Sequence, residues 1–531
     1  MILFSRLATV GLSALMVVTV LSDRCLAAAA IPANAQIGTT TVSRPSPSIR
    51  AVWRVSVNAS DPVRRFSTVV GFDPSNAGDL FGTWPDQAFY SLKKLGITSI
   101  RTHDAAEMDW PQLFPNWSAN PDSPSSYDFK NSDRILKAMV QIGFAPFLSL
   151  GTSGYDPNGL RYEGIADNPP NPLKWSRIAE HIVAHDVGGW DHGYHFPIKY
   201  VEIWNEPTRD RRGFWSGTPQ QFYALCADTL RTIKGAFPKL WVGACGVCFP
   251  NRPTFTSDLL AYLASHHTPL NFFSWHVYEG NPVYLGKKGD GVSMFLKFAR
   301  LIRRDLNRSG YTKCQSICSE WNAPTPFAVL NTLMLAQHER LAATYLYPGL
   351  WHPRRYWISG LDQTWVRPDQ NQIWRTKEKA WAFRAYWVLR SITPLWIPVK
   401  GEILPHSLAI AARTHGTRCL QLLLSDTSPQ YRRVRVILAG CPARRRFRVV
   451  RIPLDDLLPK TPVDSGNVLV PRNGKLKFWL NWSPPEAMIL RITVARQRRH
   501  AAVLQPAGSE HLPYASKSGD RIFALPRTVS E

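Results

Sequence analysis

Two glutamates stand at the ends of expected strands, which would place both carboxyl groups at strand tips. Residues 199–207 begin with alternating apolar side chains and end in Asn-Glu-Pro, so a strand would deliver Glu206 at its tip and the proline would stop it there. Glu320 arrives in the same manner at the end of the expected strand over 315–319. Glycoside hydrolysis needs such a pair, one carboxyl group to protonate the leaving oxygen and another to attack the anomeric carbon or activate water.

Strand and helix patterns alternate around these glutamates, which predicts an α/β fold. Eight strands with helical segments between or after them fit within residues 66–395, and this favours a closed (β/α)8 TIM barrel. An open doubly wound sheet is the alternative, but no glycine-rich phosphate loop follows the first strand. The expected strands are 66–72, 98–103, 145–150, 200–205, 240–244, 271–276, 315–319 and 355–359, with a helix over 326–345 before the last.

The two glutamates fall on strands that lie across the barrel mouth from each other. Glu206 is on the fourth expected strand and Glu320 on the seventh, so their carboxyl groups can converge on one sugar. Asn205 precedes Glu206, and its amide can hydrogen-bond a sugar 2-hydroxyl, a contact that strengthens in the transition state.

Four more polar residues are expected to face the same site because side chains two apart on a strand share one side. His276 and Tyr278 end the sixth strand, and Arg101 and His103 end the second. His103 is a candidate ligand for a sugar hydroxyl. Arg101 is either a further ligand or the ion-pair partner of one of the glutamates.

Segments outside the barrel differ from it in composition. The chain begins with Arg6, an apolar run at 7–21 and small residues at 27–30, which is typical of an export signal and predicts a secreted or periplasmic protein. An uncleaved membrane anchor is the alternative. The expected division is 1–35 signal peptide, 36–65 linker and peripheral strands, 66–395 barrel, 396–495 β-sandwich with an N-terminal contribution, and 496–531 disordered basic tail.

The formal net charge of +24 favours anionic partners, and the 20 tryptophans and 17 tyrosines supply rings on which sugars stack. No basic recognition helix or aromatic single-strand platform accompanies the charge, so nucleic acid is not an expected partner. Among the cysteines, Cys419 and Cys441 are the expected disulfide pair, since both fall among short strands of one region.

Several segments together resemble the clan A glycoside hydrolases, and most closely glycoside hydrolase family 39. They are Arg-Thr-His at 101–103, 142–148, Trp-Asn-Glu-Pro at 204–207 with Phe-Trp at 214–215, Ser-Trp-His-Val-Tyr at 274–278 and Ser-Glu-Trp-Asn at 319–322. The family includes β-xylosidases, α-L-iduronidases and bacterial exopolysaccharide hydrolases. The resemblance implies that Glu206 is the general acid/base, that Glu320 is the nucleophile bonded by Tyr278, and that anomeric configuration is retained.

The chain departs from the xylosidase-like pattern after His103, where residues 104–109 replace a run of aromatic and acidic side chains. Basic pairs also occur at 287–288 and 303–304. An acidic or branched bacterial exopolysaccharide therefore has equal weight with a plant-type oligosaccharide or a β-xylosidase substrate. The candidate sugar ligands at or just past strands seven and eight are Trp321, Trp357, Asp362 and Trp365.

Two other function classes remain as alternatives, a non-catalytic carbohydrate-binding barrel and a metal-dependent hydrolase. The metal hypothesis would use His103, Asp104, Asp109 and His276, since a strand-end His-x-Asp can start a barrel metal site. The later strands offer no well-spaced histidine set. We therefore expect neither a metal nor another cofactor.

Overall fold

A computed structural model describes most of residues 52–495. The gaps within this range are 75–91, 94, 104, 154–167, 209–213, 249, 251–253, 279–290, 324, 348–380, 393–394, 402–405, 414–418, 428–432 and 456. The expected signal peptide and basic tail thus lie outside the described residues. Within the described part, none of the helices has the length and apolar character needed to cross a bilayer.

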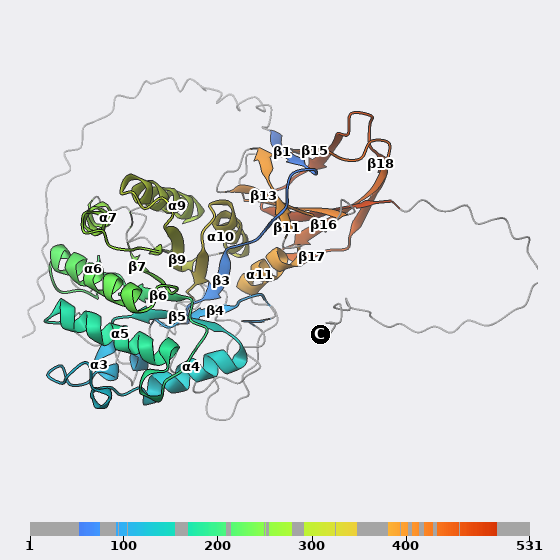
Figure 1. The fold of residues 1–531 in the computed structure, drawn as a ribbon. Coiled ribbons are helices and arrows are strands. Elements are labelled where there is room, and N and C mark those ends of the chain that lie inside the picture. The colour runs from blue at the N-terminus through green and yellow to red at the C-terminus, as the bar shows by residue number, and fades with distance from the viewer. Residues whose placement is uncertain are drawn as a thin grey trace, which may run out of the picture. The chain divides into compact units, whose positions relative to one another are not determined.

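Eight parallel strands close into a barrel in chain order, with the eighth strand pairing to the first. This confirms the predicted (β/α)8 fold. The barrel strands are β3 (Val69–Phe72), β4 (Ser99–Arg101), β5 (Ala145–Leu150), β6 (Tyr200–Ile203), β7 (Trp241–Val247), β8 (Phe272–Tyr278), β9 (Gln315–Asn322) and β10 (Ala343–Leu346). Figure 1 shows β3 to β7 and β9 of this barrel with helices around them.

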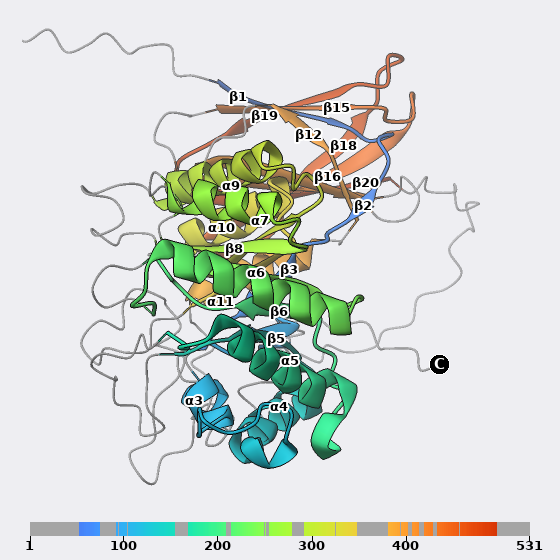
Figure 2. The ribbon, with the colours of Figure 1, turned by 60° about the vertical axis from the view of Figure 1, so that its left-hand side comes forward.

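Amphipathic helices cover the outside of the strands, as Figure 2 shows for the α4 to α9 side. Their ends follow local signals: the Thr218 side chain and the Gln221 side chain form a capping box at the start of α6, and Gly143 ends α4 in a left-handed conformation. Among the described residues, the helices of more than one turn are α4 (Lys130–Ile142), α5 (Pro172–Gly188), α6 (Pro219–Ala236), α7 (Phe255–Ser265), α9 (Gly291–Arg308), α10 (Pro326–His338) and α11 (Trp381–Ser391).

The eighth barrel strand lies earlier than predicted. Helix α10 ends at His338, Arg340 turns the chain with a left-handed backbone (φ 57°), and β10 follows at once. The expected helix over 326–345 was therefore too long, and the strand expected at 355–359 lies outside the described residues. Since β10 is buried on both faces, its short apolar run has no alternation that would distinguish it from the end of a helix.

Aromatic side chains fill the amino-terminal half of the barrel and form a floor below the polar site. This cluster consists of Phe147, Tyr200, Phe272, Ile317, Ala343 and Tyr345. The Tyr345 hydroxyl lies 2.9 Å from the Ser99 hydroxyl, and its ring passes directly over Gly71, where a Cβ atom would overlap it. The missing side chain at Gly71 is what lets the ring occupy the barrel axis.

Strands from both ends of the described chain form a β-sandwich beside the barrel, as predicted. One sheet has the order β12-β1-β15-β19 and the other β17-β16-β20-β14-β13-β11-β2, with β18 pairing to β16. The strands are β1 (Val52–Asn58), β2 (Arg64–Arg65), β11 (Leu395–Ile397), β12 (Val399–Gly401), β13 (Ser407–Arg413), β14 (Cys419–Asp426), β15 (Arg433–Ala439), β16 (Arg446–Asp455), β17 (Leu458–Pro459), β18 (Val463–Leu469), β19 (Leu476–Asn481) and β20 (Glu486–Val494).

A core between the two sheets includes Trp53 and Trp482, whose rings meet edge to face at 5.8 Å. The larger sheet also contacts the barrel, where Ser425 donates a hydrogen bond of 2.6 Å to Asn331 on α10.

The expected Cys419–Cys441 disulfide is wrong, since Cys441 carries a free thiol. The two cysteines belong to different sheets: β14 begins at Cys419, whereas Cys441 follows β15.

We predict that Gly71→Ala lowers the free energy of unfolding by about 1–3 kcal/mol, because the added methyl group overlaps a buried ring that cannot retreat. Urea denaturation measures the change. Gly235→Ala is the control, since nothing lies within 4 Å of a Cβ there and alanine is a better helix former. Equal stability of Gly71→Ala and wild type would contradict this account of the floor.

Candidate active site

The stretch that carries Glu206 leaves the geometry of a regular strand at the end of β6. Trp204 and Glu206 both have left-handed backbones, with φ of 69° and 44°. Non-glycine residues adopt this conformation at a cost of roughly 1–3 kcal/mol, and only where packing enforces it. Trp204 provides that packing: its ring is fully buried, and its indole donates a 2.6 Å hydrogen bond to the Phe214 carbonyl.

A β-bulge positions Glu320 within β9. The pairing between β8 and β9 shifts by one residue, with Trp275 opposite Cys318 but His276 opposite Glu320. Ser319 is the extra residue, and bulges of this kind re-aim side chains beside active sites. As a result, consecutive residues contact the same imidazole: the Ser319 hydroxyl lies 3.1 Å from Nε2 of His276, and a Glu320 oxygen lies 3.5 Å from Nδ1.

His276 lies between the two glutamates. Its Nδ1 is 2.8 Å from Oε1 of Glu206, and one carboxylate oxygen from each glutamate and one imidazole nitrogen all lie within 4.8 Å of one another. All three residues are buried, with exposed fractions of 5% for Glu206 and 4% for Glu320. The sequence prediction that the two carboxyl groups converge agrees with this placement.

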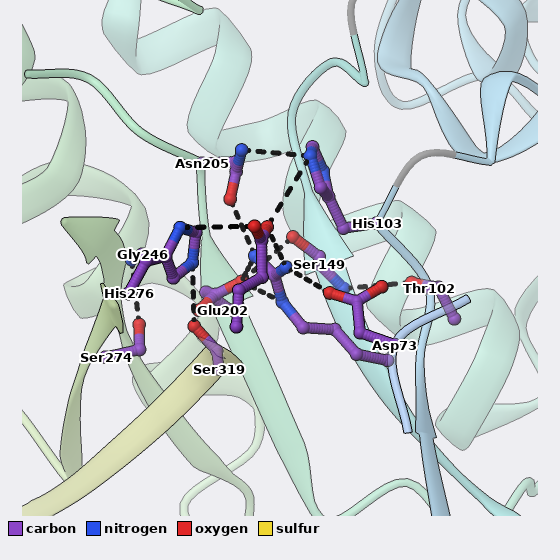
Figure 3. A network of polar contacts seen from close by, with 12 residues as sticks. Asp73, Thr102, His103, Ser149, Glu202, Asn205, Gly246, Ser274, His276 and Ser319 are labelled. Atoms are coloured by element: carbon purple, nitrogen blue, oxygen red, sulfur yellow. Dashed lines mark hydrogen bonds and ion pairs between the residues drawn. The ribbon is translucent and has the colours of Figure 1, made fainter. Parts of the chain in front are cut away.

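Arg101 is fully buried below the glutamates and donates hydrogen bonds to three carboxylates. The distances are 2.6 Å to Asp73, 2.5 Å to Glu202 and 2.7 Å to Glu320. Figure 3 labels Asp73 and Glu202 within this network of polar contacts. Arg101 is therefore an ion-pair partner of the expected nucleophile, one of the two roles the sequence left open.

The pKa values of this network follow from burial and pairing. Burial alone would lower the pKa of Arg101, but the charges of Glu202, Asp73 and Glu320 outweigh it and raise that pKa well above its usual value. Burial alone would raise the pKa of Glu202, yet the Arg101 charge, a hydrogen bond from Ser274 and the nearby His276 lower it. Both groups are therefore held in their charged forms.

Hydrogen bonds at both the oxygen and the nitrogen fix the orientation of the Asn205 side-chain amide. Its carbonyl accepts a 2.7 Å hydrogen bond from Arg101, and its amino group donates to Nε2 of His103 at 2.9 Å (Figure 3). A neutral His103 ring that accepts at Nε2 carries its proton on Nδ1. On the other side of the site, the Tyr278 hydroxyl donates to Oε2 of Glu320.

The structure thus brings Arg101, His103, Asn205, His276 and Tyr278 together with the two glutamates, as expected from the sequence. Trp321 does not join them. Its ring is fully buried in the core, because the side chain after Glu320 on β9 points away from the barrel axis, and a stacking role is therefore wrong for it. Three other expected ligands lie outside the described residues: Trp357, Asp362 and Trp365.

Residues that the sequence reasoning missed support the site from below. They are Asp73, Ser149, Glu202, Gly246, Ser274 and Ser319. Glu202 had a usable signal, because a carboxylate between Val201 and Ile203 in an apolar strand requires a buried cation. Gly246 had no such signal in the sequence. A Cβ atom there would lie 2.9 Å from both Asn205 Oδ1 and His276 Nε2, and only the folded structure shows this close approach.

Two clusters in the described part of the chain have a spacing that could hold a metal ion: Glu206 with His276 and Glu320, and Asp133 with His185 and Asp186. Both ring nitrogens of His185 are engaged, by Asp133 at 3.0 Å and by the Trp190 carbonyl at 2.9 Å. Of the alternative metal ligands His103, Asp104, Asp109 and His276, only His276 belongs to either cluster of the described residues. Asp109 instead accepts hydrogen bonds from Ser153, and Asp104 lies outside the described residues.

Comparison with known proteins points to one family. A family model described as glycosyl hydrolases family 39 matches residues 42–294, which confirms the resemblance predicted from the sequence. The chain is 25% identical to a β-xylosidase of Caldicellulosiruptor saccharolyticus over 203 residues, 37% of this chain and 39% of that protein. For a β-xylosidase of Geobacillus stearothermophilus the identity is 26% over 198 residues, 35% of this chain and 37% of that protein. The matches thus span well under half of these relatives.

Solved structures share the fold over a longer range. A glucosidase from Croceicoccus marinus superposes with a TM-score of 0.59 at 21% identity, covering 84% of this chain and 100% of the other. A family 39 enzyme from Xanthomonas axonopodis pv. citri gives 0.56 at 16% identity, covering 85% and 99%. Likeness at these identities establishes the barrel-and-sandwich architecture.

We predict that Gly246→Ala lowers kcat by about 10²-fold or more, because a methyl group at φ +57° would displace Asn205 and His276 from their present positions. Steady-state kinetics on a cleaved glycoside, together with a thermal melt, separates this effect from unfolding. Gly235→Ala serves as the matched control. Unchanged kcat in a folded Gly246→Ala protein would show that this close approach has no part in activity.

We also predict that Glu202→Gln lowers the free energy of unfolding by about 3 kcal/mol at pH 7, because a buried ion pair loses one partner. The folded pKa of Glu202 is below its ordinary 4.5, so its contribution is complete above about pH 4.5 and is lost as pH falls through the folded pKa. Urea unfolding from pH 7 to 3 should show the difference narrowing on the acid side.

The control for this experiment is Glu339→Gln, which removes a carboxylate that pairs with the exposed Arg300 at 3.1 Å. Such surface pairs contribute about 0–1 kcal/mol. If Glu202→Gln lowered the free energy of unfolding by the same amount at every pH, the result would contradict an electrostatic role for the Glu202 carboxylate.

Proposed function

We propose that this protein is a glycoside hydrolase that cleaves O-glycosidic bonds with retention, through double displacement by Glu206 and Glu320. The family 39 match and the barrel support a glycosidase. The observation that carries the mechanism is the separation of the two carboxylates, whose nearest oxygens lie within 4.8 Å. Retaining enzymes hold these groups about 5–5.5 Å apart, whereas inverting enzymes need roughly 6.5–9.5 Å to admit a water molecule.

In the first step, a Glu320 oxygen forms a bond to the anomeric carbon while the bond from that carbon to the leaving oxygen breaks. Glu206 delivers its proton to the leaving oxygen. Arg101 and Tyr278 both donate hydrogen bonds to the Glu320 carboxylate, which fixes its direction of attack. The Asn205 amide has two N–H donors, of which His103 engages one, and the second can bind the sugar 2-hydroxyl.

In the second step, Glu206 accepts a proton from water as the water oxygen attacks the anomeric carbon and the bond to Glu320 breaks. His276 contacts Glu206 through Nδ1 and Ser319 through Nε2. It therefore holds the acid/base carboxylate at a constant position while that group loses and regains its proton.

The substrate is proposed as an oligo- or polysaccharide, and the +24 charge supports an acidic bacterial exopolysaccharide as the first candidate. The two relatives named β-xylosidase support an exo-acting xylosidase as the second candidate. Export is part of the proposal, on the strength of Arg6 and the apolar run at 7–21.

The mechanism predicts different behaviour for the two glutamate variants. Glu320→Ala should be inactive on aryl β-xyloside, aryl iduronide or an acidic exopolysaccharide, whichever the wild type cleaves, and azide should restore turnover with an inverted glycosyl azide. Glu206→Ala should lose about 10²–10⁴-fold on substrates with poor leaving groups and much less on activated aryl glycosides, with azide giving the retained product. Product configuration is read by NMR.

Glu339→Ala is the control, because this glutamate lies at the end of α10 rather than at the carboxyl ends of the strands. Full activity of Glu320→Ala on a substrate that the wild type cleaves would refute the two-glutamate mechanism. A retained azide product from Glu320→Ala would instead exchange the two roles.

A further inference from the structure

A hollow of about 190 Å³ lies between helix α10 and the sandwich strands β2, β11 and β13. Its floor is apolar, with Met334, Leu408 and Ile410. Its rim carries Arg64 and Arg340, and we call it the junction pocket. Because Arg64 precedes β3 and Arg340 precedes β10, the pocket lies toward the amino ends of the barrel strands, away from Glu206 and Glu320.

One wall of the junction pocket is aromatic. Phe66 and Trp396 stack with ring centroids 6.3 Å apart and planes only 4° from parallel, and both side chains are partly exposed. The pair is held in place because Trp396 on β11 is registered opposite Arg64 on β2 and Ala412 on β13. A flat ring at the edge of a small hollow is a surface on which the apolar face of a sugar can pack.

The rim of the pocket is cationic. Arg64 and Arg340 are exposed, and neither guanidinium group has a hydrogen-bond or ion-pair partner in the described part of the chain. Guanidinium groups bind carboxylates through two parallel N–H donors, so two such groups over an aromatic wall suit a ligand that is both flat and anionic. A pocket of this size is below the roughly 300–1,000 Å³ of drug-sized sites and suits a single sugar ring.

A second basic hollow adjoins the first across the end of α10. It is lined by Glu339 and by four arginines of α9, namely Arg300, Arg303, Arg304 and Arg308, and we call it the arginine groove. Glu339 lies in sequence between His338 and Arg340, which line the junction pocket. Helices α9 and α10 also pack against each other, so the two hollows lie on neighbouring helices.

We propose that the junction pocket binds one carboxylated sugar unit of an anionic polysaccharide, and that the arginine groove attracts the units that follow. The carboxylate would pair with Arg64 and Arg340, and the ring would pack against Trp396. The inference goes beyond the proposed hydrolysis, because the pocket holds a polymer without cleaving it. It draws on the proposed function only for the expectation that the ligand is a carbohydrate.

The test is the affinity of the full-length Glu320→Gln protein, which prevents turnover, for hexagalacturonate and for neutral xylohexaose, measured by isothermal titration calorimetry at two salt concentrations. Arg64→Gln/Arg340→Gln should weaken hexagalacturonate binding at least ten-fold. Arg444→Gln/Arg445→Gln removes the same charge from an exposed turn of the sandwich and should have little effect. Trp396→Ala should weaken binding similarly, and Trp396→Phe should restore part of it.

Equal weakening by the two arginine pairs would mean diffuse attraction by net charge and would overturn the proposal. Unchanged affinity in Arg64→Gln/Arg340→Gln would overturn it as well, as would xylohexaose binding that depends on Trp396 alone. Hydrolysis of an aryl glycoside by the same variants in the wild-type background is measured separately and should stay within two-fold. A protein that binds hexagalacturonate at this pocket but cleaves no glycoside would refute the proposed function and leave this inference standing.

Discussion

The buried guanidinium of Arg101 is the interaction on which the site depends. A cation with no exposed surface is tolerated only when carboxylates surround it, and here Asp73, Glu202 and Glu320 do so from three other barrel strands or their ends. Because the guanidinium is planar and its donors are fixed in direction, it ties the ends of β3, β4, β6 and β9 to one geometry. The same ion pairs therefore hold these barrel strands together and place the Glu320 carboxylate. The aromatic floor lies below them.

Departures from regular strand geometry do the fine positioning above this ion network. Regular alternation would send Ser319 and Glu320 to opposite faces of β9, and only the bulge lets both reach His276. The left-handed backbone at Glu206 turns its carboxyl group toward the same imidazole. The aromatic residues behind these distortions are buried and interlocked, with Trp204 packing edge to face on Trp175 at 5.8 Å. Rigid packing thus stabilises a conformation that isolated strands would avoid.

Sequence reasoning found the parts of the site that follow from strand periodicity. Arg101 and His103, or His276 and Tyr278, share a side because they are two residues apart, and the strand-end glutamates followed from where apolar runs stop. It could not find contacts made through space between distant strands, such as Asp73 with Arg101 or the approach of Gly246 to His276. It also misplaced the eighth strand, because four residues buried on both faces carry no period. Trp321 was misassigned although the alternation rule applied to it. The residue next to an inward-facing Glu320 on the same strand takes the opposite face.

The place of β1 has a consequence for how the chain is made and folded. This strand lies before the barrel in sequence, yet it pairs with β12 and β15 beyond it, and Ser60 bonds the Gly440 carbonyl across 380 positions. During synthesis the whole barrel sequence is made before β12 and β15, so β1 stays unpaired until those two strands are available. Contacts this distant in sequence form late and slowly. We therefore expect the sandwich to assemble late in folding. A chain that ended before β19 would leave Trp53 without Trp482 and would expose the edge of β15 to other chains.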